Sequence, residues 1–267
     1  MLRSKSVCQH LIDLLHKKII LLNNWVSRII FLLCVLVPLV GYSQSGSVPL
    51  TDSNFQTAVN MWFSDEANAT ATYGHISDWN TSAVTNMSEA FKDRSSFNEN
   101  ITDWDTSKVT RMNKVFDGAT SFNQDISNWN TSRVTTMSGM FKNASSFNQD
   151  ISNWNVSSVT SLHRMFEGAT SFNQPIGDWN VSSVTNMLSL FMGATSFNQP
   201  LANWNVSSVS DMQQLFSDAV SFNKPIGNWN VSSVTKMNWM FTRATQFNQS
   251  LSDWNVSTVV NMEGMFE

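Results

Sequence analysis

A fixed 25-residue period dominates this sequence. Tryptophan recurs every 25 residues from residue 79 to residue 254, with no insertion or deletion. A constant period of this length is typical of repeat proteins, in which each unit packs mainly on its neighbours. The tryptophans of this series are Trp79, Trp104, Trp129, Trp154, Trp179, Trp204, Trp229 and Trp254.

Each copy of the period places apolar residues at the same positions. In the copy that spans residues 126–150, these include Ile126, Val134, Met137 and Phe141. Fifteen of the 18 phenylalanines fall in two such columns, so the repeat, and not a local site, places the aromatic residues. We therefore expect the core to contain the eight tryptophans and a phenylalanine column that includes Phe141, Phe166 and Phe191.

Two periodicities coexist within a copy. Val134, Met137, Phe141 and Ala144 have helical spacing, which predicts a helix of about two to three turns with one buried face. The segment 147–151 is short and bounded by polar residues, which favours an extended conformation. The predicted fold class is an α/β repeat solenoid. It is a leucine-rich-repeat-like stack of about eight 25-residue units, each with a short extended segment and a short helix.

Residues 44–75 are predicted to form an N-terminal cap and loop. Ser53 and Gln56 have the spacing of a capping box, and an amphipathic helix is expected to follow. Its apolar face would consist of Phe55, Ala58, Val59 and Trp62. Because the first unit of a repeat stack must cover its open core face, we expect this helix to cap the stack. Residues 65–75 are predicted to be the loop into the first repeat; an independent binding helix is the alternative.

Residues 1–43 have the features of a secretory signal peptide. A basic lead precedes a 12-residue apolar run at residues 29–40, and small residues follow. The run is shorter than the roughly 20 residues that span a bilayer. We expect cleavage near Ser43 and a protein that is secreted or at the cell surface. Contact with a membrane would come only through this segment or an unseen anchor, and a retained anchor is the alternative.

Removal of this leader changes the chemistry of the chain. Both cysteines, Cys8 and Cys34, lie within it, so the mature chain would have no disulfide. The leader holds five of the 16 basic and one of the 20 acidic residues, which leaves 11 and 19, a net charge of about −8. An acidic chain without a basic stripe argues against a nucleic-acid partner.

The repeats occupy residues 76–267, and the last copy is incomplete. We expect the chain to be a piece of a longer protein, because an open apolar end invites association. An exposed last core face is the alternative.

The repeated unit resembles a known family. Its pattern is WNTS or WNVS, then V-T-x-M-x-x-M-F, then A-x-x-F-N-Q, over residues 76–267. This pattern is similar to that of BspA-like leucine-rich-repeat surface proteins of bacteria, which overlap with a repeat family of unknown function in mycoplasma lipoproteins. The resemblance implies an exported, surface-displayed protein that adheres to host or matrix proteins. It supplies no catalytic residues.

No catalytic, cofactor or metal site is predicted. His75 and His163 lie far apart, and His163 with Arg164 is interpreted as a solvated surface pair. No metalloprotease, hydrolase or phosphate-binding motif occurs in the sequence. The residue before each tryptophan is Asp or Asn, as at Asp78 and Asn128, and these oxygens could suit calcium. Because half are asparagine, turn formation is the preferred interpretation.

Recognition residues are sought at the positions that vary between copies. Leu188 and Met192 replace polar residues of other copies, and Trp239 replaces Gly139, with Arg243 four residues later. Large apolar residues on an outer face are contact candidates, so these four residues form the predicted protein-contact surface. Scattered surface apolar residues are the alternative.

The predicted function is therefore adhesion or protein–protein contact by an exported, non-catalytic surface protein, with a protein or matrix ligand. A carbohydrate-binding surface is one alternative, because exposed aromatic rings stack on sugars. A passive spacer for a missing C-terminal module is the other.

Overall fold

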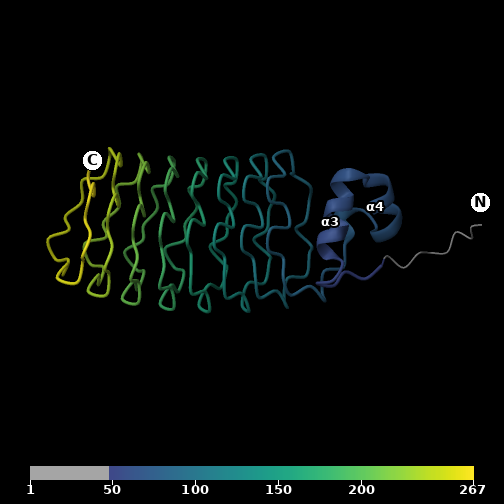
Figure 1. The fold of residues 1–267 in the computed structure, drawn as a ribbon, viewed down its shortest axis with the longest axis horizontal. Coiled ribbons are helices and arrows are strands. Elements are labelled where there is room, and N and C mark those ends of the chain that lie inside the picture. The colour runs from purple at the N-terminus through teal and green to yellow at the C-terminus, as the bar shows by residue number, and fades with distance from the viewer. Residues whose placement is uncertain (1–47) are drawn as a thin grey trace, which may run out of the picture. The chain divides into compact units, whose positions relative to one another are not determined.

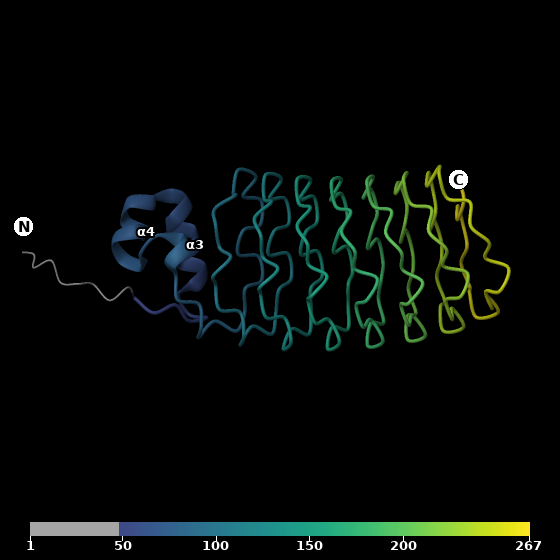
Figure 2. The ribbon, with the colours of Figure 1, turned by 180° about the vertical axis from the view of Figure 1, so that it is seen from behind.

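The computed structural model describes residues 48–267. In this part of the chain the helices are α3 (Phe55–Ser64), α4 (Glu66–Tyr73) and a 3-10 turn, η1 (Ile76–Asp78). The 25-residue copies follow one another as coils of turns, side by side in both ribbon views (Figures 1 and 2). The described repeats contain no β-strand and no α-helix, only turns and isolated parallel bridges such as Asn86 to Arg111. The predicted α/β solenoid is therefore wrong.

Left-handed backbone conformations explain why no helix forms in a coil. Within the coil 126–150, Gly139 has φ 64° and Asn143 has φ 55°. A right-handed helix cannot continue through such residues. The chain instead makes successive tight turns, in which the N–H groups of Met140 and Ala144 donate to the carbonyls of Met137 and Phe141. These turns still bury the apolar residues, so the helical spacing indicated the buried face correctly but not the conformation.

Backbone hydrogen bonds join each coil to the next. The N–H groups of Gly139, Phe141 and Asn143 donate to the carbonyls of residues 163, 165 and 167, at 2.8, 2.9 and 2.6 Å. Because these donors belong to turn residues, the coils are linked without a strand. The predicted extended segment 147–151 contains no strand either, and its Asn148 N–H donates to the side-chain oxygen of Asn123 at 2.9 Å.

The interior consists of aromatic columns. Phe141 and Phe147 of one coil stack at 3.9 Å between ring centroids, and Phe141 lies 5.7 Å from Phe166 of the next coil. Each repeat tryptophan is buried and donates its indole N–H to a backbone carbonyl; Trp154 donates to Ile126 at 3.1 Å. The rings therefore combine apolar burial with a satisfied polar atom.

Helix α3 lies against the first coils. It buries Phe55, Ala58, Val59 and Trp62, as the helical spacing predicts. The Phe55 ring contacts Trp104 at 5.7 Å and the Trp62 ring contacts Trp79 at 6.2 Å between centroids. The predicted capping box is wrong, because Asn54 is the N-cap and makes no side-chain bond to the helix. Its side-chain oxygen accepts from the Thr51 N–H instead.

The predicted loop at residues 65–75 is also wrong, because most of it is helix α4. The side chain of Asp65 accepts from the Asn68 N–H at 3.1 Å and starts the helix. Gly74, with φ 84°, ends it. The predicted signal peptide, residues 1–43, lies outside the described residues. No helix within residues 48–267 has the length and hydrophobicity needed to cross a membrane.

Candidate recognition face

Five positions of each coil vary from copy to copy and lie together around the left-handed turns. In the coil 126–150 they are Thr136, Ser138, Gly139, Lys142 and Asn143. We call the surface formed by these positions in all coils the variable face. Its neighbours in the sequence, such as the methionine and phenylalanine columns, are buried and nearly constant. Differences between coils are therefore concentrated on this face.

Two rows of left-handed residues run along the variable face. The second row is Asp93, Gly118, Asn143, Gly168, Gly193, Asp218 and Arg243, and all but the last are residue types that tolerate positive φ. The first row differs in its residue types, and we use the name left-handed row for this row alone. It consists of Glu89, Lys114, Gly139, Arg164, Ser189, Gln214, Trp239 and Gly264, with φ between 53° and 64°.

The left-handed row retains side chains where glycine would fit best. Only two of its eight members are glycine. A left-handed conformation costs an ordinary L-residue about 1–2 kcal/mol. Strained backbone of this kind gathers at functional sites, where the side chain serves another purpose than stability. Ser189 is buried and donates a hydrogen bond to Gln214 at 3.2 Å, whereas the other five side chains of the row reach the surface. Among the described residues, these five are the strongest structural indication of a functional surface.

The four predicted contact residues all belong to the variable face but do not form one cluster. Leu188 and Met192 are half-buried within the coil 176–200. Trp239 is half-buried and lies two coils further along the chain. Its ring packs over Gly264, so a Cβ added to this glycine would lie 2.3 Å from the indole. Arg243 is exposed and its guanidinium pairs with Asp218, with one N–O distance of 2.8 Å.

A polar groove at the other end of the variable face was missed by the sequence analysis. Its volume is about 510 Å³ and it crosses four coils. It is lined by Lys92, Asp93, Lys114, Asp117, Ser138, Gly139, Lys142, Asn143, His163 and Arg164. We call this hollow the polar groove. The pair His163–Arg164, interpreted from the sequence as a solvated surface pair, is part of its wall.

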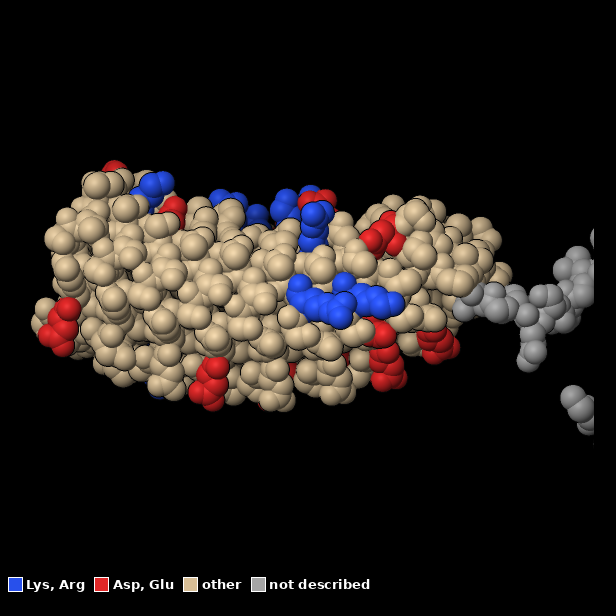
Figure 3. All heavy atoms as spheres, turned by 90° about the horizontal axis from the view of Figure 1, so that it is seen from below, with Lys and Arg blue, Asp and Glu red and all other residues tan. Residues whose placement is uncertain are grey.

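Beside the polar groove, each of two carboxylates lies within 4 Å of two basic side chains. Glu89 lies 3.7 Å from the Lys92 ammonium and 3.3 Å from that of Lys114. Glu167 lies 3.8 Å from the Lys142 ammonium and 3.2 Å from the Arg164 guanidinium. Much of the face shown in Figure 3 carries no charged side chain.

Burial changes the ionisation of two groove residues. It raises the pKa of Asp117, and the nearby Asp93 adds to this effect while Lys142 opposes it. Burial, followed by the charge of Arg164, lowers the pKa of His163. This shift favours the neutral form of His163. Its Nε2 atom is buried and has no hydrogen-bond partner among the described residues.

The repeat pattern that builds this face is that of a known family. A family model described as Mycoplasma protein of unknown function, DUF285, matches residues 57–178 and 160–267. The chain belongs to the DUF285 family. No curated protein matches it. The family description assigns no activity, so the function of this DUF285 chain must be argued from its own residues.

The residues before the tryptophans, such as Asn128 and Asn153, lie in turns in this DUF285 chain. The residues after the tryptophans form turns of their own. The side chain of Asn130 accepts from the Ser132 N–H at 3.0 Å, and the same turn recurs in other coils. Within the described residues, no three His, Cys, Asp or Glu side chains are grouped as they would be around a metal ion.

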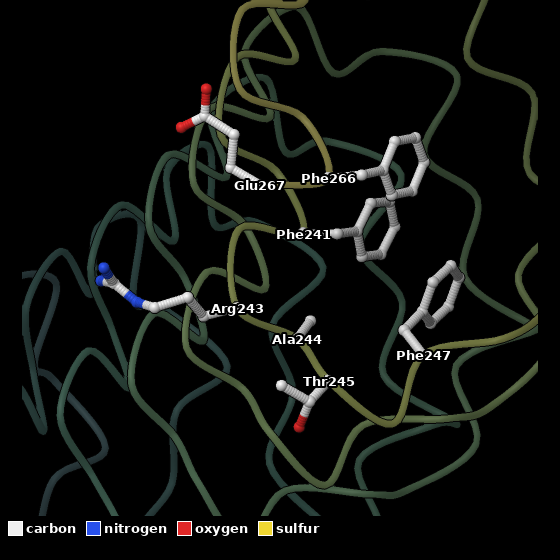
Figure 4. Close-up of a pocket in the computed structure, with 7 residues that line it drawn as sticks. All are labelled: Phe241, Arg243, Ala244, Thr245, Phe247, Phe266 and Glu267. Carbon is white, nitrogen blue, oxygen red and sulfur yellow. The ribbon is translucent and has the colours of Figure 1, made fainter.

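A second hollow, of about 350 Å³, lies at the last coil of the DUF285 repeats. Figure 4 shows the rings of Phe241, Phe247 and Phe266 beside it, with Arg243 and Glu267 turned away. The ring centroids of Phe241 and Phe266 lie 5.4 Å apart, and the equivalent pair Phe141 and Phe166 in the interior lies 5.7 Å apart. Its aromatic residues belong to the same columns as those in the coil–coil interior, so we assign it no ligand.

Proposed function

We propose that this DUF285 chain is an exported, non-catalytic surface protein that mediates adhesion or protein–protein contact through its variable face. The observation that carries the proposal is the left-handed row, in which six of eight positions keep a side chain against the preference for glycine. Of these six side chains only Ser189 is buried, and it makes a hydrogen bond within the stack. A passive spacer would not require the five that reach the surface, where glycine would relieve the strain.

The apolar part of the variable face supplies contact residues for a protein partner. Trp239 presents a large ring from a left-handed position, and Leu188 and Met192 are half-buried on the same face, two coils away. Tryptophan is among the residues that contribute most to binding in protein interfaces. Fixed rings also lose little conformational entropy on binding.

Export and surface display rest on the sequence. The basic lead and apolar run of residues 1–43 support secretion. The BspA-like pattern of the repeat supports the surface role. N-terminal sequencing of the secreted chain tests the first point, with a new N-terminus near residue 44 expected.

The contact role is tested by binding of the purified chain to a panel of immobilised matrix proteins. For a partner found in this way, Trp239→Ala should weaken binding by at least about 1 kcal/mol, roughly fivefold. Gln214→Ala, on the same row, is the matched control and should change affinity less. Unchanged affinity of the Trp239 variant would remove this residue from the contact. Absence of binding by the wild-type chain to the whole panel would count against the adhesion role.

A further inference from the structure

We propose that the polar groove binds an anionic polysaccharide, one that carries uronate carboxylates or sulfate groups. The inference rests on the proposed function of the variable face and names a ligand class for one part of it. The polar groove is separate from Trp239, which lies three coils beyond Arg164.

The shape of the polar groove comes from three consecutive members of the left-handed row. Lys114 and Arg164 are exposed, and Gly139 between them is buried and has no side chain. An added Cβ on Gly139 would lie 3.2 Å from the Lys114 side chain, so this glycine leaves the space that the groove occupies. Lys92 and Lys142, each three residues after a member of the left-handed row, line the same hollow.

The cations of the polar groove retain N–H donors. Of the two lysines paired with Glu89, Lys114 donates a hydrogen bond to it, whereas Lys92 lies 3.7 Å away. Lys142 lies 3.8 Å from Glu167, also beyond hydrogen-bond distance. An ammonium group has three donors and a guanidinium five. A single carboxylate shared by two cations therefore leaves donors that an incoming anion can use, with the short bonds typical of charged partners.

Neighbouring carboxylates limit the range of this attraction. Glu89 and Glu167 accompany the four cations, and Asp93 and Asp117 line the hollow. The local charge is thus nearly balanced, and the described chain is acidic as a whole. We expect recognition to depend on directed hydrogen bonds at short range and to weaken with added salt.

The lining favours a sugar over a peptide. It contains no large apolar side chain in which a peptide could anchor a residue, and hydroxyl, amide and imidazole groups come from Ser138, Asn143 and His163. Such groups bond to the hydroxyls of a carbohydrate while the cations bind its acidic groups. An acidic peptide is the competing ligand that the experiment must distinguish.

Calorimetric titration of the purified chain tests the proposal. The probes are a galacturonate tetrasaccharide, a heparin tetrasaccharide, maltotetraose as the neutral sugar and tetraglutamate as the acidic peptide. We expect one or both acidic sugars to bind at least tenfold more tightly than maltotetraose and tetraglutamate. Their relative affinity shows whether carboxylate or sulfate is preferred. Equal binding of tetraglutamate, equal binding of maltotetraose, or no binding of either acidic sugar would overturn the proposal.

Glycine variants link the binding to the polar groove. Lys114→Gly with Arg164→Gly should lower affinity for the acidic sugar at least tenfold, and the chain should stay folded because glycine fits both left-handed positions. Lys108→Ala, which removes an exposed cation outside the variable face and the groove, should leave the affinity unchanged. A folded double variant with wild-type affinity would contradict the assignment. Loss of sugar binding alone, with protein binding still sensitive to Trp239→Ala, would leave the contact role intact.

Discussion

The indole N–H of Trp154 donates to the backbone carbonyl of Ile126, 28 residues earlier, at 3.1 Å. The equivalent bond recurs along the column, for example from Trp179 to Ile151 and from Trp204 to Ile176. Each tryptophan therefore fixes the register of its coil against the preceding one, because a shift of one residue would leave a buried donor without a partner.

Trp154→Phe tests this bond. The phenyl ring keeps most of the apolar contact but removes the donor and some volume, so we expect a loss of about 2 kcal/mol in the free energy of unfolding. The measurement is urea unfolding followed by circular dichroism. Trp239→Phe is the control, because this ring is only half-buried, packs over Gly264 and lies outside the column of indole hydrogen bonds, and it should cost less than about 0.5 kcal/mol. Equal losses in the two variants would show that the indole bond contributes nothing.

Substitution of Lys114 distinguishes a left-handed turn from a helix. Both Lys114→Gly and Lys114→Ala remove the surface ion pair with Glu89, but only glycine adopts φ 54° without strain. The glycine variant should therefore be the more stable of the two by about 1 kcal/mol. In an α-helix the order is reversed by about the same amount. Thermal unfolding of the two proteins decides between these orders.

Two glycines of the second row form a matched pair. A Cβ on Gly168 would lie 2.5 Å from the side-chain oxygen of Asn143, whereas the nearest atom to a Cβ on Gly193 is 3.8 Å away. Both have φ 67°, so both alanine variants carry the same backbone strain of about 1–2 kcal/mol. Gly168→Ala should unfold at the lower temperature, because it adds a steric clash. A lower midpoint for Gly193→Ala would contradict the packing described here.

The depressed pKa of His163 predicts a loss of stability on acidification. Below its ordinary pKa of about 6.5, the unfolded chain binds a proton at this histidine more readily than the folded chain does, so stability falls as the pH drops from about 7 toward 5. His163→Gln should lose less stability over this range. The difference between the two proteins isolates the histidine, because the effects of Asp117 and the other carboxylates are common to both. Parallel losses would show that His163 is not buried as a neutral group.

The period and the buried columns were predictable, because strict 25-residue spacing leaves one register for Trp154 and Phe141. The conformation of each coil was not, since the spacing of Val134, Met137 and Phe141 suits both a helix and a series of tight turns. The missed signal was the column with Gly118, Asn143 and Gly168, whose residue types share a tolerance of positive φ.

Helix α4 and the polar groove were missed for different reasons. Helix α4 buries only Ala69 and Tyr73, so its sequence has no apolar stripe to indicate a helix. The polar groove combines residues such as Lys92, Lys114 and Arg164 from separate coils. Their proximity depends on the stacking geometry and on the absence of a side chain at Gly139, neither of which a single copy of the repeat reveals.

The central claim, that the left-handed row is kept for recognition, is tested most directly by one variant that carries glycine in place of Glu89, Lys114, Arg164 and Trp239. Its binding to the matrix panel and to the acidic tetrasaccharides is measured beside its thermal unfolding. We predict a folded protein that unfolds within a few degrees of the wild-type chain and binds none of the wild-type ligands. A folded variant with undiminished binding would contradict the account.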